Sequence, residues 1–378
     1  MPPLAEPDYG LQIKVEQLNV TSAEGCDSCQ LLTGLIDQVG WVAADGDVLD
    51  CYNDTEDAPL DVSILHAKTR ERQTVELYAT PSSPSRWECI GLANDVPERL
   101  SLEYCSAIVT RWLADCAGHE NCPLLERSRY SPPTRLIAID PMGRSIKLIT
   151  PDADFVADYV PLSHRWGSQE MIVTTKGNLL QHCDEIPMAN LPATFRDAVQ
   201  LLSAIGIGYA WIDSLCIVQD DKADWAEEAA RMSQVYMNGL FTIAADNGPD
   251  SSYGLFTAGQ NRRVRSGRLS EEINIRPAGE RALTAVAHTP IDDRGTKATV
   301  SVLSSLAWVF QERLLSNRTL HFTEAEMAWE CGTELRCECQ VNANPYQQHI
   351  LPIGLRQVAV RQRSGYPIAN GSHRLYPA

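Results

Sequence analysis

Basic residues and long apolar runs are both scarce in this sequence. Its 378 residues include 32 lysines and arginines against 49 aspartates and glutamates, a formal net charge of -17. No basic stripe stands out, so nucleic acid is not an expected partner. No stretch approaches the roughly 18 apolar residues of a membrane span, and the initial MPPLAEPDYG lacks the regions of a secretory signal. These absences predict a soluble, cytoplasmic protein with no membrane span.

Common catalytic signatures are missing as well. The sequence contains no GxSxG elbow, no Walker GxxxxGK[ST], no GxGxxG after a strand and no HExxH. Their absence argues against the usual hydrolases, nucleoside triphosphatases, dinucleotide-dependent dehydrogenases and zinc proteases. Chemistry in this chain would therefore rest on residues outside those signatures.

Twelve cysteines are present, and a reducing compartment favours free thiols, metal ligands or core residues over disulfides. Cys26-x-x-Cys29 and Cys116-x-x-His119-x-x-Cys122 carry soft ligands that suit a structural zinc ion. Neither spacing is that of a standard zinc finger, and Cys29 and Cys116 also fit the apolar faces of predicted helices. Zinc binding and core packing both stay open for these residues.

The residue pattern divides the chain into four parts. Residues 1–125 form a mixed α+β region. Residues 126–157 hold a hairpin, because TRLIAID and SIKLIT alternate in apolarity around PMGR. Residues 158–331 alternate strands and helices, with a polar excursion over residues 261–300. Residues 332–378 form a poorly patterned tail.

The alternation after residue 158 predicts a parallel sheet. LPATFRDAVQLLSAIG carries one apolar stripe, with Pro192 in its first turn and Gly206 at its end, which is typical of a helix. DDKADWAEEAARMSQVYMNG is a second amphipathic helix, and DYVPLSH, YAWIDSLCIV and LFTIAAD are predicted strands. This order indicates right-handed crossovers. The predicted fold class is α/β, a parallel sheet with flanking helices, plus an α+β N-terminal region.

Polar residues follow the predicted strands, and ligands bind to such sheets outside the carboxyl ends of the strands. One polar loop follows the first strand, a second closes YAWIDSLCIV, and residues 245–248 follow the third. The alternative, in which Asp213 caps the next element and Cys216 packs in the core, stays open. The candidate substrate-binding residues come from the first two loops, except for Trp225 in the following helix. They are Ser163, His164, Arg165, Trp166, Gly167, Asp213, Cys216, Gln219, Asp220 and Trp225.

A carboxylate in the second helix is a candidate catalytic group. At about 100° per residue, Trp225 lies on the buried face, Glu228 borders that face, and Glu227 points to solvent. A half-buried carboxylate beside a tryptophan is a candidate acid or base with a perturbed pKa. The alternative is a salt bridge from Glu228 to Arg196 or Arg231.

The sequence resembles the fungal heterokaryon incompatibility (HET) domain over about residues 158–331. Four blocks carry the resemblance in the family's order: YVPLSHRWG, LPATFRDAVQLLSAIGIGYAWIDSLCIVQDD, DWAEEAARMSQVYMNGLFTIAA and AWVFQERLLSNRTLHFTEAEMAWEC. WLADCAGHENC and PPTRLIAID are similar to the lead-in of large proteins of this family. His164 and Arg165 depart from the family, in which a Tyr followed by a variable residue is more usual.

The resemblance implies a role in fungal nonself recognition and programmed cell death, through protein partners or self-association. HET domains are remotely similar to TIR domains, so it also implies a TIR/flavodoxin-like sheet. Some TIR domains hydrolyse NAD with the glutamate of a W-x-x-E segment, which is residues 225–228 here. In such an NAD glycohydrolase Glu228 would be catalytic, Arg165 a phosphate partner and Trp166 a stacking surface. An inactive or truncated copy of the family is a further hypothesis.

Overall fold

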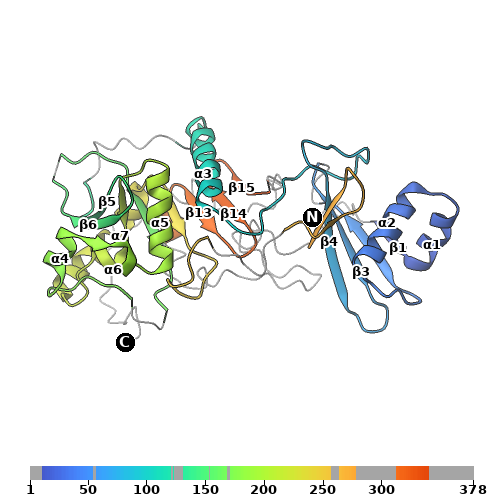
Figure 1. The fold of residues 1–378 in the computed structure, drawn as a ribbon, viewed down its shortest axis with the longest axis horizontal. Coiled ribbons are helices and arrows are strands. Elements are labelled where there is room, and N and C mark those ends of the chain that lie inside the picture. The colour runs from blue at the N-terminus through green and yellow to red at the C-terminus, as the bar shows by residue number, and fades with distance from the viewer. Residues whose placement is uncertain are drawn as a thin grey trace, which may run out of the picture.

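Two sheets, each with its own helices, organise the protein (Figure 1). None of the helices described here is long and apolar enough to cross a membrane. A computed structural model describes residues 11–53, 57–120, 122, 131–152, 154–167, 171–256, 264–277 and 312–339.

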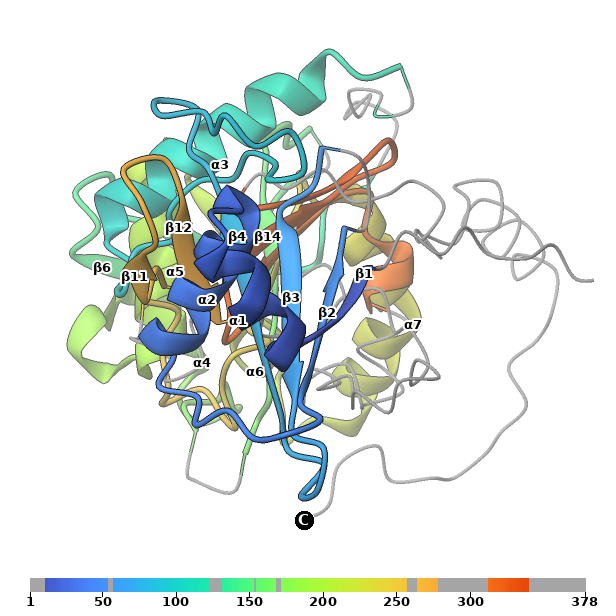
Figure 2. The same cartoon turned by 90° about the vertical axis from the view of Figure 1, so that its right-hand side faces the viewer.

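The first sheet is antiparallel throughout and carries two helices on one face (Figure 2). These are α1 (Val15–Ala23) and α2 (Asp27–Gln38), whose Leu18 and Leu35 are buried in a core shared with Val62. In order across the sheet, the strands are β1 (Leu11–Lys14), β2 (Val48–Tyr52), β3 (Leu60–Leu65), β4 (Arg72–Tyr78), β12 (Asn274–Pro277) and β11 (Gly267–Arg268).

Strands β11 and β12 belong to the excursion predicted over residues 261–300. Arg276 on β12 donates from Nε to Glu76 Oε1 on β4 at 2.7 Å, and its guanidinium lies over the Tyr78 ring. Both charged side chains are fully buried, where an ion pair requires such geometry to offset desolvation. The described part of the excursion therefore leaves the second sheet and completes the first one.

The second sheet has a parallel centre and antiparallel edges. Its four central strands, counted along the chain, lie in the order 2-1-3-4, which is also the order at the start of a flavodoxin-like sheet. In order across the sheet, the strands are β15 (Leu335–Cys337), β14 (Met327–Glu330), β13 (Thr319–Phe322), β10 (Thr242–Ala244), β7 (Val160–Ser163), β9 (Tyr209–Trp211), β5 (Leu136–Ile139), β6 (Ser145–Ile149) and β8 (Ile186–Pro187).

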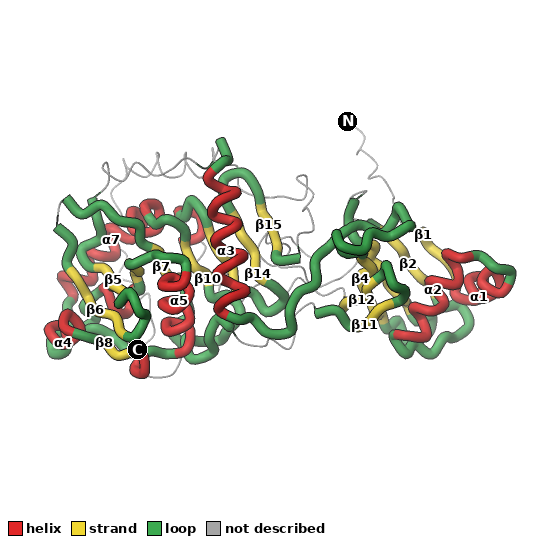
Figure 3. The backbone as a smooth tube through the Cα atoms, turned by 45° about the horizontal axis from the view of Figure 1, so that its top comes forward, coloured by secondary structure: helices red, strands yellow, loops and turns green. Residues whose placement is uncertain are grey.

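Helices cover both faces of the second sheet. α5 (Ala193–Ala204) and α7 (Lys222–Asn238) lie on opposite sides of it (Figure 2), and each buries apolar residues of its predicted stripe. α3 (Leu102–Ala117) packs on α5 and buries Trp112 in the same core, so part of the predicted N-terminal region joins the second sheet (Figure 3). α4 (Leu179–Asp184) and α6 (Asp213–Cys216) are short.

Three sequence predictions need correction or extension. YAWIDSLCIV is a strand only over its first three residues, and α6 (Asp213–Cys216) occupies four of the others, because a short apolar run does not distinguish a strand from a helix. The predicted hairpin forms as β5 and β6, and β5 also pairs with β9, which extends the second sheet. β15 lies within the tail predicted to be poorly patterned, whereas residues 340–378 lie outside the described residues.

A small apolar cluster joins the two units. Tyr78 and Val96 on the first side meet Leu335 and Cys337 on the second. The backbone N–H of Asn94 also donates to the carbonyl of Cys339 at 2.8 Å. The edge of the second sheet near β15 is therefore attached to the first unit.

Candidate functional site

The parallel strands deliver a polar cluster to their carboxyl ends. Trp166 follows β7, and its indole Nε1 donates to Asp213 Oδ2, just after β9, at 2.7 Å. Asp213 Oδ1 accepts from the backbone N–H of Ser214 at 2.7 Å and lies 3.8 Å from His164 Nδ1. Two loops that are distant in sequence thus share one carboxylate, as the rule for parallel sheets predicts.

His164 is the most enclosed member of this cluster. Its ring meets Phe195 edge-on at 4.8 Å between centroids, and its Nε2 has no hydrogen-bond partner among the described residues. Burial lowers the pKa of His164, and the nearby Asp213 carboxylate only partly opposes that shift. A neutral imidazole therefore faces Asp213 at neutral pH.

A second carboxyl group, which is buried, joins the cluster from the segment that precedes β13. Ser163 at the end of β7 donates its hydroxyl to Glu312 Oε2 at 2.5 Å. Burial raises the pKa of Glu312 to about 8, a shift that the Ser163 hydrogen bond opposes and the Asp213 charge increases. Glu312 thus brings a second carboxyl group to the cluster, close enough for the charge of Asp213 to act on it.

The next strand ends carry an ionic network. His321 on β13 contacts Asp246 through Nδ1 at 2.8 Å and Glu330 through Nε2 at 3.3 Å. Arg313 donates from Nε to Glu330 at 2.6 Å. Burial alone would lower the pKa of His321, but the two carboxylates outweigh it and raise that pKa. The network is charge-balanced and holds the ends of β10, β13 and β14 together.

Several predicted substrate-binding residues are buried or make contacts within the protein. Cys216 is fully buried, and burial raises its pKa to about 12, so it is not a thiolate nucleophile at neutral pH. Gln219 donates its side-chain amide to the carbonyls of Asp213 and Ile217. Asp220 accepts from the backbone N–H of Lys176 at 2.8 Å.

The remaining predicted residues lie around these contacts. The backbone carbonyl of Arg165 accepts from the Ser251 hydroxyl at 3.3 Å. Gly167 has φ +75°, and a Cβ there would lie 2.3 Å from Asp250 Cβ, so glycine is required by the backbone. Trp225 is half-buried against the core. The site that the structure assembles centres on Ser163, His164, Trp166 and Asp213.

Glu228 lies on the buried side of α7, and Glu227 is exposed, as the helical periodicity predicts. Neither carboxylate oxygen of Glu228 makes a hydrogen bond of ordinary geometry to a described residue. Burial raises the pKa of Glu228, and Thr134, Arg135 and Arg231 oppose that shift. The alternative, a salt bridge from Glu228 to Arg196 or Arg231, is not found among the described residues. Arg231 instead donates to the Thr134 hydroxyl (2.5 Å) and to a backbone carbonyl.

A group of metal-binding side chains lies away from this cluster, at the end of α3. Its four ligand atoms all lie within 4.8 Å of one another. The predicted cysteines at positions 26 and 29 are not part of it: they lie at the start of α2 in the first unit, where the Thr21 hydroxyl donates to Cys29 Sγ. The members of this Cys₃His group are Cys116, His119, Cys122 and Cys331.

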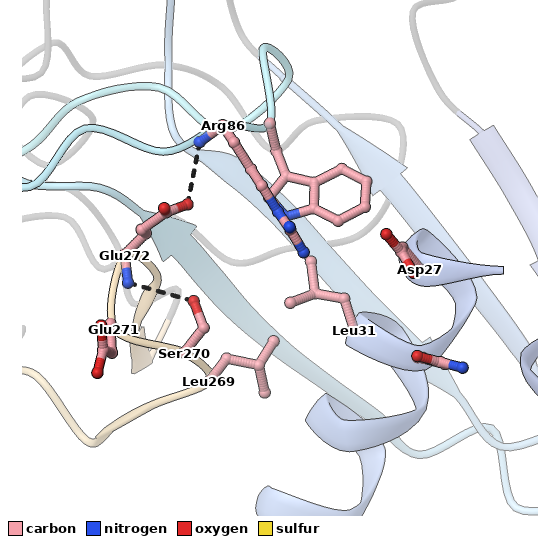
Figure 4. A pocket seen from close by; sticks show the side chains of 9 residues that line it. Asp27, Leu31, Arg86, Leu269, Ser270, Glu271 and Glu272 are labelled. Atoms are coloured by element: carbon pink, nitrogen blue, oxygen red, sulfur yellow. Dashed lines mark hydrogen bonds between the residues drawn. The ribbon is translucent and has the colours of Figure 1, made fainter. Parts of the chain in front are cut away.

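A pocket of about 440 Å³ lies in the first unit, between α2 and the β11–β12 turn (Figure 4). Arg86 stacks over the Trp87 ring at 5.3 Å, and its backbone N–H donates to Glu272 at 3.1 Å. Asp27 and Leu31 line the helical side. The lining mixes both charges without a buried unpaired group that would select one ligand.

Sequence reasoning missed three residues of these sites. Glu312 and His321 carry no local signal, since only the folded sheet brings them to Ser163 and Asp246. Cys331 lies 212 residues from His119, so only the folded chain brings the two together. The polar loop at residues 245–248, by contrast, pointed to Asp246.

The comparisons with known proteins give one result. The family model described as heterokaryon incompatibility protein (HET) matches residues 159–312. The matched segment begins beside β7 and ends at Glu312, so it contains the whole Ser163–Glu312 cluster. The chain matches no curated protein and no solved structure.

Proposed function

Because this chain carries a heterokaryon incompatibility domain over residues 159–312, we propose that it acts in fungal nonself recognition and signals programmed cell death. The observation that carries the proposal is the match itself, since it covers the polar cluster from Ser163 to Glu312. The signal passes to protein partners or through self-association by a TIR-like domain, a description that the 2-1-3-4 order of the parallel strands supports.

The test is a viability assay in a filamentous fungus with the full chain under an inducible promoter. Wild-type expression is expected to kill hyphal compartments, and Asp213→Asn is expected to abolish killing at equal protein abundance. Glu227→Ala serves as a matched control, because Glu227 is an exposed carboxylate outside the cluster. Harmless wild-type expression, with or without a second incompatible strain, would reject the proposal and favour an inactive copy.

A second candidate function is NAD hydrolysis with Glu228 as the catalytic residue. The observation that favours it is a buried carboxylate without an ordinary hydrogen bond, at W-x-x-E spacing from Trp225. Such a group can stabilise an oxocarbenium-like ribose in the way glycosidase carboxylates do. Its burial implies that α7 or the segment around Thr134 must shift for substrate to reach it.

The experiment is to incubate the purified chain, dilute and concentrated, with NAD and to measure nicotinamide release. Activity is expected in the wild type and in Glu227→Ala but not in Glu228→Ala. Release of nicotinamide by a folded Glu228→Ala protein would place the chemistry elsewhere. Killing without any NAD turnover would leave the signalling proposal standing and reject the enzymatic one.

A further inference from the structure

The Cys₃His group is built from two segments that flank the matched domain. Cys116 lies in the last turn of α3, where the backbone N–H of His119 bonds the Cys116 carbonyl and that of Cys122 bonds the His119 carbonyl. These successive turns place three ligands on one side of the chain. Cys331 arrives from the other end of the domain, directly after β14.

Two histidine–sulfur distances within the group are those of a tetrahedral zinc site. His119 Nδ1 lies 3.7 Å from Cys122 Sγ and 3.6 Å from Cys331 Sγ. With Zn–S bonds of about 2.3 Å and a Zn–N bond of about 2.0–2.1 Å, the S···N edge of a tetrahedron is about 3.6 Å. Four protein ligands fill all the positions, which is typical of a structural ion rather than a catalytic one.

The outer contacts are those that orient metal ligands. His119 directs Nδ1 to the sulfurs, while its Nε2 lies 3.5 Å from Glu334 Oε1. Arg336 in turn bonds Glu334 at 2.6 Å and Asp115 at 2.5 Å. A carboxylate on the far nitrogen fixes the tautomer and ring plane of a ligating histidine. Arg336 thereby connects the end of α3 to β15.

Charge balance also fits a thiolate-bound ion. Three thiolates and one zinc ion carry a net charge of about -1. Buried Arg318 donates from Nε to Cys116 Sγ at 3.2 Å and from Nη2 to the Cys122 carbonyl at 3.0 Å. The backbone N–H of Thr333 approaches Cys331 Sγ at 3.5 Å. A cation and backbone donors thus surround the sulfurs.

We propose that the Cys₃His group binds one structural zinc ion, which ties α3 to the β13–β14 hairpin. The ion links the segment before the matched domain to the segment after it, because its ligands lie on both sides of residues 159–312. The inference does not depend on the proposed function, since it concerns a site outside the polar cluster.

The experiment is elemental analysis of the full chain, purified under reducing conditions without chelator. One zinc ion per chain is expected in the wild type and none in Cys331→Ser. Cys105→Ser is the matched control, because Cys105 is buried on the same helix outside the group. Cys29→Ser is expected to keep its zinc, which separates this site from one that includes the N-terminal cysteines.

Cobalt exchange keeps the proposal testable if the serine variant fails to fold. The wild type loaded with cobalt should show the visible bands of a tetrahedral ion and a sulfur charge-transfer band for three thiolates. In His119→Cys that band should grow in the proportion of four thiolates to three. A folded, reduced wild type that takes up neither zinc nor cobalt would overturn the proposal.

Discussion

The indole of Trp166 donates its hydrogen bond to Asp213 at 2.7 Å, and this contact joins the carboxyl ends of two adjacent parallel strands. Trp166→Phe removes the donor and keeps most of the ring. We expect the free energy of unfolding to fall by about 1.5–3 kcal/mol, the range for a hydrogen bond to a charged group. Urea denaturation followed by circular dichroism measures this change.

Trp225→Phe is the matched control for that substitution. Trp225 is half-buried and has no carboxylate partner in the described structure comparable with Asp213. Its substitution is expected to change the free energy of unfolding by less than about 1 kcal/mol. Equal losses in the two variants would mean that ring packing, not the bond to Asp213, accounts for the effect of Trp166→Phe.

The Ser163–Glu312 pair predicts a pH dependence of stability. The pKa of Glu312 is about 8 in the folded protein, against an ordinary 4.5. Between these values the folded protein keeps a proton that the unfolded chain has released. The stabilisation is therefore complete below pH 4.5 and falls by about 1.4 kcal/mol per pH unit as the pH rises toward 8.

Glu312→Gln should remove this slope, because an amide does not titrate and still accepts from Ser163. Urea unfolding of the wild type and the variant at pH 6, 7 and 8 gives the comparison. Glu227→Gln, a change at an exposed carboxylate on α7, should keep the wild-type slope. An unchanged slope in Glu312→Gln would contradict the assignment of the titrating group.

Gly167 in the turn after β7 combines a positive φ with a close contact, and Gly206 allows the two effects to be measured separately. Gly167 and Gly206 have φ of +75° and +78°, but only at Gly167 would a Cβ meet another residue, Asp250, at 2.3 Å. Gly206→Ala should cost about 1–2 kcal/mol of folding free energy through backbone strain alone. Gly167→Ala should cost roughly 1–3 kcal/mol more, because overpacking is added. Similar melting temperatures for the two variants would contradict this argument.

Local patterns in the sequence predicted that the polar cluster lies at the carboxyl ends of the parallel strands, and they predicted the orientation of α7. Trp166 and Asp213 were both expected at the carboxyl ends of parallel strands, and that topological rule needs only the order of strands and helices. Glu228 was expected on the buried border because helical periodicity depends on nearby residues alone. Both predictions use local patterns and the order of elements along the chain, and neither requires knowledge of contacts between distant segments.

Contacts between distant segments were not predictable in this way. Glu312 reaches Ser163 only through the pairing of β13 with β10, and Cys331 reaches His119 through the β13–β14 hairpin. The assignment of Cys216 to a strand was wrong because four residues, Asp213–Cys216, turn into α6 inside an apolar run. Core burial of that thiol was the alternative reading, and it is confirmed.

Substitution of Glu228 is expected to raise stability and to lower function. A buried carboxylate without an ordinary hydrogen bond carries a desolvation cost. Glu228→Gln keeps the shape and removes the charge, so the free energy of unfolding at pH 8 should rise by about 1–2 kcal/mol. Cell killing or NAD turnover should fall in the same variant. A less stable Glu228→Gln protein would instead mean that Arg135 and Arg231 stabilise the charged form.

Removal of metal gives the last prediction, which rests on the Cys₃His site. A chelator should lower the melting temperature of the wild type by roughly 3–4 °C, as loss of about 2–3 kcal/mol does in a protein of this size class. Zinc, but not magnesium, should restore it, because thiolates bind the softer ion. Cys331→Ser lacks the site and should not respond to the chelator, whereas Cys105→Ser should respond as the wild type does. A chelator response in Cys331→Ser equal to that of the wild type would show that the stabilising ion lies elsewhere.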